Sequence, residues 1–351
     1  MNDDQRSFLV SLVRATGPSG YESGAQEIWR NRVSSVADVH TDSLGSAIAS
    51  LNPGGSPRVM LEAHIDEIGF QVKYIDDNGF LYFNTIGGFD PATLAGNRVR
   101  ILGHNGPVNG VIGRKPAHLL AEEDRKAHPK IKDMWIDIGA RNAEEARNAV
   151  SIGDAGGRVH DVTDLLGNFL ASNSFDDRVG SYVIAEVLLS IARENPSAAV
   201  FAASAVQEEI GLRGAGPAAY SIDAPIGVAV DVTYTSDHPE TRKTEVGDIR
   251  CGAGPVLTRG AATNPRIFER LVQAAEAAGV PYQVEGNPTG RGTDQYAMYV
   301  VRSGMATGLV SIPTRYLHTA SEVLSQDDVD AAVALLARFV LDLPEHPDVT
   351  P

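Results

Sequence analysis

The order of apolar segments along the chain constrains the fold more than any other feature of the sequence. Residues 198–206 and 224–232 are short apolar stretches typical of buried strands, whereas residues 181–194, 265–279 and 326–343 carry apolar residues at helical spacing. Strands that alternate with helices in this way form a parallel or mixed sheet with helices on both faces. The sequence therefore predicts an α/β fold in which a mixed sheet is flanked by helices.

The segment from about residue 72 to about residue 163 has a different character. Glycine residues interrupt alternating polar and apolar patterns there, and the tripeptides DNG (77–79) and HNG (104–106) each separate two such patterns, as in β-hairpins. We therefore predict a larger α/β domain formed by residues 1–71 and 164–351. A small, β-rich, barrel-like domain at residues 72–163 interrupts it.

Composition and charge exclude several classes of function. The net charge of −15 argues against a nucleic-acid partner, because binding to phosphates requires a basic surface. Cys251 is the only cysteine, so the chain has no intrachain disulfide framework. The first 17 residues lack both a basic region and a long apolar stretch, and the sequence shows no signal peptide or membrane span. We therefore expect a cytoplasmic protein without a nucleic-acid or membrane partner.

Potential metal ligands follow three of the predicted strands. His64 and Asp66 end the first of these, Glu208 and Glu209 the second, and Asp231 the third. Binding sites in open α/β sheets form at the carboxyl ends of strands. Taken singly, each acid could instead cap a helix or lie in a solvated loop. Together they form an imidazole and carboxylate set that suits zinc or a similar divalent ion, so we predict a metal site.

The spacing within these pairs suggests separate roles. His64 and Asp66 are two residues apart and therefore share one face of a strand, where Asp66 could hold the second ring nitrogen of His64. Glu208 and Glu209 are adjacent and point in different directions. One of them could bind metal while the other accepts a proton from water. The spacing alone leaves open which glutamate has which role.

Two further segments carry candidate ligands. The sequence SFDDRVG (174–180) precedes a predicted helix, so one of Asp176 and Asp177 is expected to cap that helix. The other acid is then free to bridge two metals. His318 lies at the boundary of a strand and a turn, with an acid nearby.

Six motifs, in order along the chain, resemble the signature blocks of the dinuclear-metal aminopeptidases of the glutamyl/deblocking aminopeptidase family. This family includes the tetrahedral, TET-type peptidases. The motifs are AHIDEIGF, SFDDRVG, VQEEIGLRGA, VDVT, GTDQ and RYLHTASEV. The resemblance extends through nearly the whole chain and includes a β-rich insertion in the expected place. It implies an aminopeptidase that removes N-terminal residues from peptides.

The resemblance also implies a role for each candidate residue. Asp176 is expected to bridge two divalent metal ions. His64 and Glu209 are expected to complete the shell of one ion, and Asp231 and His318 the shell of the other.

By the same resemblance, Glu208 is the unligated general base, Asp66 orients His64, and the peptide bond between Asp176 and Asp177 is cis. Zinc suits this ligand set best, although cobalt or manganese would fit the same ligands. The expected partners are peptide substrates and other copies of the chain. Residues 72–163 are expected to mediate dimerisation, and the dimers to assemble into a tetrahedral dodecamer.

Two positions depart from the family pattern. Arg291 and Gln295 flank the Thr-Asp pair of the GTDQ block, near the expected specificity pocket. A guanidinium there could favour an acidic substrate side chain. It could equally form a structural salt bridge or a subunit contact.

Two other functions remain as alternatives. An endoglucanase-type glycoside hydrolase would need an acid/base carboxylate pair beside a sugar-binding cleft, and few aromatic residues surround the motifs. A catalytically idle cage protein that binds peptides is the second alternative. The complete ligand set argues against it.

Overall fold

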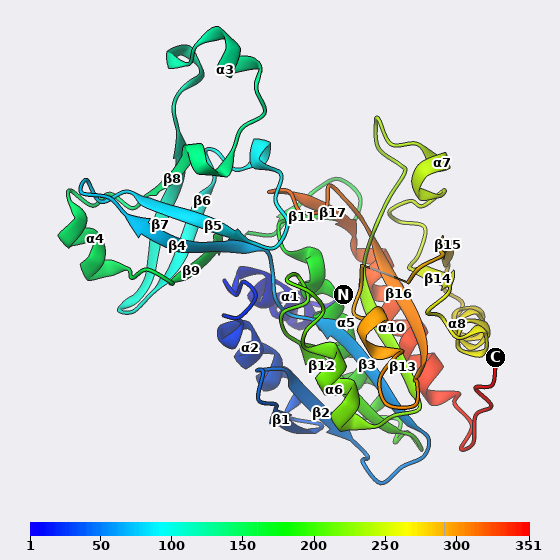
Figure 1. The fold of residues 1–351 in the computed structure, drawn as a ribbon. Helices are drawn as coiled ribbons and strands as arrows, with labels where there is room; N and C mark the ends of the chain where they lie inside the picture. Colours follow the sequence, from blue (N-terminus) through cyan, green and yellow to red (C-terminus); the bar gives the residue numbers. More distant parts are fainter. Residues whose placement is uncertain (160, 291) are drawn as a thin grey trace.

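The chain forms two distinct parts in a computed structural model, which describes residues 1–159, 161–290 and 292–351. One part is a large sheet with helices on both faces, and the other is a β-barrel that projects from it (Figure 1). The structure confirms the predicted fold class, a mixed sheet flanked by helices with an inserted barrel.

The large sheet contains eleven of the described strands. Its central strands β12, β3, β13 and β16 run parallel to one another, and the strands at either side are antiparallel. Nine of these strands follow one another across the sheet, each paired with the next. In this order they are β1 (Asp38–Thr41), β2 (Ala47–Leu51), β12 (Ala199–Ala205), β3 (Arg58–His64), β13 (Ile226–Tyr234), β16 (Ala306–Arg315), β17 (Glu322–Ser325), β11 (Phe169–Ser172) and β10 (Thr163–Asp164). Strands β14 (Val256–Gly260) and β15 (Gln283–Asn287) pair beside β16.

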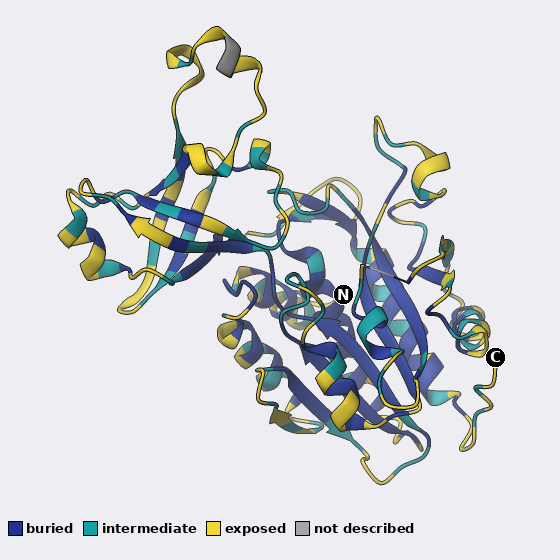
Figure 2. Cartoon of the chain, in the orientation of Figure 1, coloured by how far each residue is buried: buried dark blue, intermediate teal, exposed yellow. Residues whose placement is uncertain are grey.

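Both faces of this sheet are buried, as Figure 2 shows by the dark blue of its central strands. Successive residues of β3 point to opposite faces: Leu61 packs with one helical layer and Met60 with the other. The first layer consists of α1 (Asp3–Arg14), α2 (Ser23–Val33), α5 (Phe175–Ile191), α8 (Pro265–Ala278) and α10 (Gln326–Leu341). The second consists of α6 (Ala215–Ile222) and α9 (Gln295–Met298).

Local sequence explains where the helices begin. Asn264 caps α8 by accepting hydrogen bonds from the backbone N–H groups of Arg266 and Ile267, and Pro265 occupies the first turn. Ser325 caps α10 in the same way. No described helix is long and apolar enough to cross a membrane.

The projecting part is a closed six-stranded barrel with its own apolar core, which includes Phe70, Phe83 and Ile101. The two predicted hairpins are confirmed: β4 pairs with β5 and β6 with β7, both antiparallel. The strands are β4 (Gly69–Ile75), β5 (Leu81–Ile86), β6 (Arg98–Gly103), β7 (Gly106–Arg114), β8 (Met134–Asp137) and β9 (Ala155–Arg158). Helices α3 (Glu122–Lys126) and α4 (Ala143–Ala149) lie in its connections, as does the 3-10 turn η1 (Pro91–Thr93).

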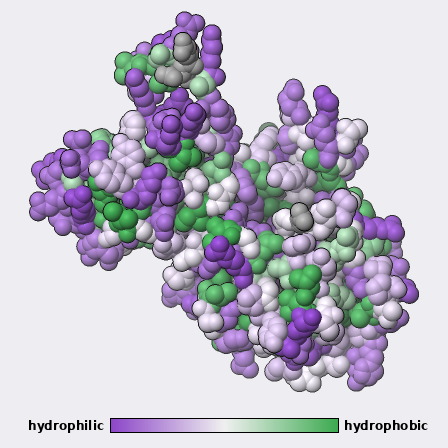
Figure 3. All heavy atoms as spheres, viewed as in Figure 1, coloured by the Kyte–Doolittle hydropathy of each residue, from purple (hydrophilic) through white to green (hydrophobic). Residues whose placement is uncertain are grey.

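The barrel is inserted directly after β3, so it leaves the large sheet at the carboxyl edge of the parallel strands (Figure 1). The surface around this junction is mixed, with apolar patches among neutral and hydrophilic residues (Figure 3). The predicted site residues lie at this same edge.

Candidate metal centre

The fold brings six of the predicted site residues together at the carboxyl edge of the parallel strands. They come from the ends of strands, from the loops that follow them and from the first turn of α5. They are His64, Asp176, Glu208, Glu209, Asp231 and His318.

Five of these residues form two potential ligand groups that share one carboxylate. His64, Asp176 and Asp231 form one group, and Asp176, Glu209 and His318 form the other. Oδ1 of Asp176 lies 3.2 Å from Nε2 of His64, and its Oδ2 lies 3.2 Å from Nε2 of His318. Each oxygen of this carboxylate therefore faces a different imidazole.

The grouping differs from the one that the resemblance implied, which paired His64 with Glu209 and Asp231 with His318. The register between β3 and β13 explains the difference. Glu62 of β3 lies opposite Ala229 of β13, so two residues further on His64 lies alongside Asp231.

Asp66 supports both His64 and the glutamate pair. Its Oδ1 lies 3.4 Å from Nδ1 of His64. The carboxylate also accepts hydrogen bonds from the backbone N–H of Glu208 (3.0 Å), from that of Glu209 (3.1 Å) and from the hydroxyl of Ser19 (2.6 Å). Sequence spacing indicated the contact with His64 but not the contacts with the pair.

Glu208 and Glu209 occupy different positions in the site. Oε1 of Glu209 lies 3.6 Å from Nε2 of His318, is buried and has no hydrogen-bond partner among the described residues. Glu208 belongs to neither ligand group, and its Oε2 lies 3.9 Å from Nε2 of His64. One glutamate thus offers a free ligand atom within a group, while the other lies beside the groups.

The two acids at the start of α5 also differ. The peptide bond between Asp176 and Asp177 is cis, as expected. Oδ1 of Asp177 accepts a hydrogen bond from the backbone N–H of Gly180 (3.1 Å), so Asp177 is the acid that caps the helix. Asp176 is left to face the two imidazoles.

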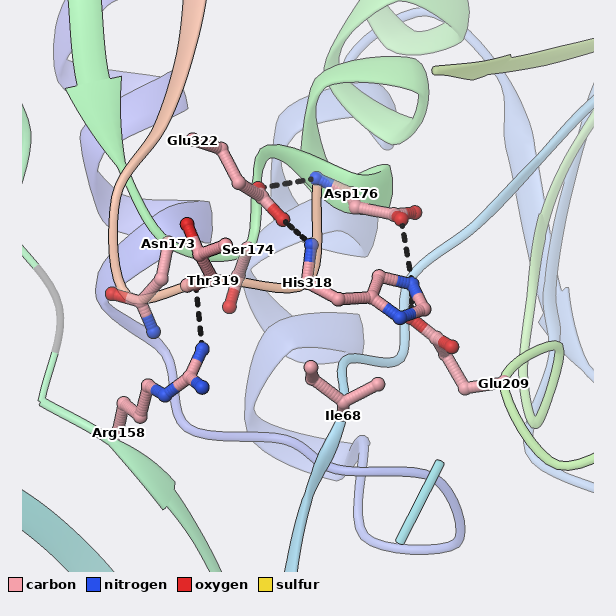
Figure 4. Close-up of a pocket in the computed structure, with 9 residues that line it drawn as sticks. All are labelled: Ile68, Arg158, Asn173, Ser174, Asp176, Glu209, His318, Thr319 and Glu322. Carbon is pink, nitrogen blue, oxygen red and sulfur yellow. Dashed lines mark hydrogen bonds and ion pairs between the residues drawn. The ribbon is translucent and has the colours of Figure 1, made fainter. Parts of the chain in front are cut away.

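Glu322, the first residue of β17, was not predicted to take part in the site. Its buried carboxylate accepts hydrogen bonds from the backbone N–H of Asp176 (3.2 Å) and from that of His318 (3.1 Å), as Figure 4 shows. It thereby fixes two candidate ligands that are 142 residues apart in sequence. Its only signal in the sequence is its position four residues after His318.

Burial and mutual repulsion raise the pKa values of three site carboxyl groups, whereas the imidazoles of His318 and His64 hold the pKa of Asp176 below its ordinary range although burial opposes this. Burial raises the pKa of Glu208 to about 7, with a contribution from the charge of Asp176. Burial also raises the pKa values of Glu209 and Asp231 well above their ordinary range. The hydrogen bond to Asp176 raises the pKa of His318 to about 9. A bound cation would relieve this concentration of buried negative charge.

The donor set fits divalent transition metals. Imidazole nitrogens and carboxylate oxygens suit zinc, and the unpartnered Oε1 of Glu209 supplies a buried ligand atom. Glu209 and His318 come together with Asp176 at one position, and His64 and Asp231 come together with it at the other.

A cavity of about 260 Å³ opens over the two ligand groups. Besides the ligands, its lining includes Val232, Tyr234 and Leu317, which are apolar or aromatic. Gln295 does not line this cavity. It is buried, and its amide donates a hydrogen bond to the hydroxyl of Thr263 (3.0 Å). Arg291 lies outside the described residues.

Comparison with known proteins shows the family to which the chain belongs. The family model of the M42 glutamyl aminopeptidases matches residues 45–335. A lysyl aminopeptidase of Pyrococcus furiosus is 35% identical over 348 residues, which cover 98% of this chain and 99% of the relative.

Two solved structures have the same fold over nearly the whole chain. A TET aminopeptidase from the marine sediment archaeon Thaumarchaeota archaeon SCGC AB-539-E09 has a TM-score of 0.92 and 31% identity, covering 97% of each chain. The TET1 peptidase of Pyrococcus horikoshii, which can assemble into a tetrahedron or a large octahedral shell, has a TM-score of 0.87 and 29% identity. It covers 97% of this chain and 100% of its own. The chain belongs to the M42 glutamyl aminopeptidase family.

Proposed function

We propose that the protein is a two-metal aminopeptidase that removes N-terminal residues from peptides. The observation that carries this proposal is the shared carboxylate of Asp176, which faces one imidazole with each oxygen. A carboxylate shared in this way can bridge two metal ions. The unshared carboxylate of Glu208 lies beside it, within reach of the same space.

His64, Asp176 and Asp231 would hold one ion, and Asp176, Glu209 and His318 the other. When bound, two such ions polarise a scissile carbonyl and lower the pKa of an attacking water. Zinc, cobalt and manganese all suit this set.

Glu208 would act as the general base. It would accept a proton from the attacking water and deliver that proton to the leaving amine. Burial raises the pKa of Glu208 above its ordinary value, and a raised pKa favours the uptake of a proton by a general base. Asp66 would hold the backbone of Glu208 and the ring of His64 in place during both transfers.

We also propose that residues 1–71 and 164–351 act as the catalytic domain and residues 72–163 as a dimerisation domain. Twelve copies would then assemble into a tetrahedral particle. The TET1 peptidase of Pyrococcus horikoshii supports this proposal, because that protein can form a tetrahedron. The exposed apolar side chains of the barrel, Tyr74, Val111, Leu119 and Ile152, offer surface for such contacts.

A panel of aminoacyl-p-nitroanilides, assayed with zinc, cobalt or manganese beside carboxymethyl-cellulose, tests the activity. We expect metal-dependent release of nitroaniline and no release of reducing sugar. The N-terminal residues that are cleaved fastest would identify the specificity. Hydrolysis of cellulose alone would instead support a glycoside hydrolase, and a lack of both activities would support an idle cage protein.

A further inference from the structure

The inserted barrel contacts the metal centre directly, although its strands supply none of the ligands. The loop after β5 passes so close that a Cβ atom on Gly88 would lie 3.6 Å from Nδ1 of His318. A Cβ on Gly87 would lie 3.5 Å from Cβ of Glu209. This part of the barrel therefore lies against the ligand group of Glu209 and His318.

Arg158, the last residue of β9, extends from the barrel to the loop that carries His318. Its guanidinium donates a hydrogen bond of 2.6 Å to the backbone carbonyl of Thr319, the next residue in the chain (Figure 4). The guanidinium also contacts two other side chains. Its Cζ atom lies 4.8 Å from the centroid of the Phe89 ring, and its Nη2 donates a hydrogen bond of 3.4 Å to the hydroxyl of Thr93. Both of these residues belong to the barrel.

This hydrogen bond is formed by a buried charge. Arg158 is 4% exposed. Burial lowers its pKa to about 10, against the opposing charges of Glu322 and Glu67, so the guanidinium stays positive at neutral pH. A hydrogen bond from an ionised donor in a buried setting is stronger than a neutral one. Arg158 therefore holds the backbone carbonyl of Thr319 firmly in place.

The loop needs such fixing because its own backbone is unfavourable. Tyr316 and His318 both have left-handed conformations, with φ values of 62° and 61°. Non-glycine residues remain in this region only when their surroundings hold them there. Glu322 holds the loop at the N–H of His318, and Arg158 holds it at the carbonyl of Thr319.

We propose that Arg158 is a positioning residue through which the barrel keeps His318 in the conformation that binds metal. This inference rests on the proposed two-metal function. It assigns the barrel a role in building the active site, in addition to any role in assembly. The ion held by Glu209 and His318 depends on Arg158, and the ion held by His64 and Asp231 does not.

The test compares Arg158→Met and Arg158→Lys with the matched control Arg14→Met. Arg14 also connects the large domain to the segment that leaves the barrel, through an ion pair of 2.8 Å with Asp161, but its side chain is 57% exposed. Zinc is titrated into the metal-free proteins by calorimetry. We expect two sites in the wild type and in Arg14→Met. In Arg158→Met, one site should keep its affinity and the other should weaken about 10- to 100-fold.

The conservative variant and the melting temperature provide further readouts. Arg158→Lys keeps the charge and should recover part of the lost affinity, whereas a purely structural role would weaken both sites together with the melting temperature. Unchanged binding at both sites in Arg158→Met, or equal weakening of the two, would overturn the proposal.

Hydrogen exchange of the metal-free proteins separates this proposal from the proposed function. Amides of residues 316–322 should exchange faster in Arg158→Met than in the wild type, and no faster in Arg14→Met. Unaltered exchange there would overturn the role of Arg158, even if the wild type binds two ions. Failure of the wild type to bind two ions would overturn the two-metal function, and with it the metal-specific role of Arg158.

Discussion

Asp66 accepts several of the hydrogen bonds that organise the site. Its two oxygens accept from the backbone of Glu208 and of Glu209 and from the hydroxyl of Ser19, and Oδ1 lies against His64. Although burial opposes ionisation, the hydrogen bond from His64 and the other donors hold the pKa of Asp66 below its usual value. It is therefore an anion that aligns a ligand and the proposed base at the same time.

We expect Asp66→Asn to weaken metal binding about 10- to 100-fold, the usual effect of removing an outer partner of a metal-bound histidine. The side-chain amide of this variant would also direct an N–H group at the N–H and O–H donors that the carboxylate of Asp66 now accepts from. Asp42→Asn is a suitable control, because Asp42 also accepts three hydrogen bonds, all from backbone N–H groups, but lies in the turn between β1 and β2. Competition with a chromogenic zinc chelator measures the effect. Equal affinity in the two variants would contradict the role given to Asp66.

At the scale of elements, sequence patterns predicted the local structures and the edge at which the site lies. The alternation of residues 198–206 and 224–232 with helical segments was sufficient to predict a mixed sheet. Strands and helices differ in the spacing of their apolar residues and in the length of their apolar segments. The glycine-containing turns predicted the two hairpins of the barrel. The clustering of His64 and Asp231 at one edge followed from the rule that parallel strands end together.

Contacts between distant elements could not be predicted in this way. The grouping of His64 with Asp231 depends on the register of β3 and β13, which no local pattern encodes. Glu322 acts on backbone groups from α5 and from the loop after β16, so its role depends on how these elements pack. In the sequence, nothing distinguishes Arg158 from other arginines at the ends of strands. Its contact with the loop of His318 depends on the placement of the barrel beside that loop.

The start of α10 is expected to make stability depend on pH. Asp328 is buried and accepts hydrogen bonds from the backbone N–H groups of Gly252 (2.6 Å) and Gly254 (2.7 Å). Burial raises its pKa from about 3.8 to about 6. The folded state therefore retains a proton that the unfolded state releases between these values. This group stabilises the fold below about pH 3.8, and its contribution is lost as the pH rises to about 6.

Asp328→Asn should remove this dependence, because the amide cannot ionise. Relative to the variant, the wild type should lose up to about 3 kcal/mol of its free energy of unfolding between pH 3.8 and pH 6. Urea unfolding of the metal-free proteins across this range measures the difference. Parallel stability curves for the two proteins would show that Asp328 does not titrate as described.

At the scale of the whole molecule, the closed barrel has no open strand edge, so association through it must use side chains. Val111 lies on β7 and is 44% exposed, and Leu44, in the turn between β1 and β2 of the large sheet, is 43% exposed. We expect the wild type to have twelve times the mass of one chain by size-exclusion chromatography with light scattering. Val111→Asp should reduce this mass, and Leu44→Asp should not. A monomeric wild type would contradict assembly. Equal masses for all three proteins would show that the surface around Val111 is not a contact between copies of the chain.

The central claim is that two ions share Asp176 and that the adjacent glutamates have different roles. The most direct measurement is the metal content and turnover of Glu208→Gln beside Glu209→Gln, two isosteric changes at neighbouring positions. We predict that Glu208→Gln retains two metal equivalents per chain and loses about 10²- to 10⁴-fold in kcat, whereas Glu209→Gln loses one metal equivalent. Near-normal turnover in Glu208→Gln, or a full metal complement in Glu209→Gln, would contradict the account.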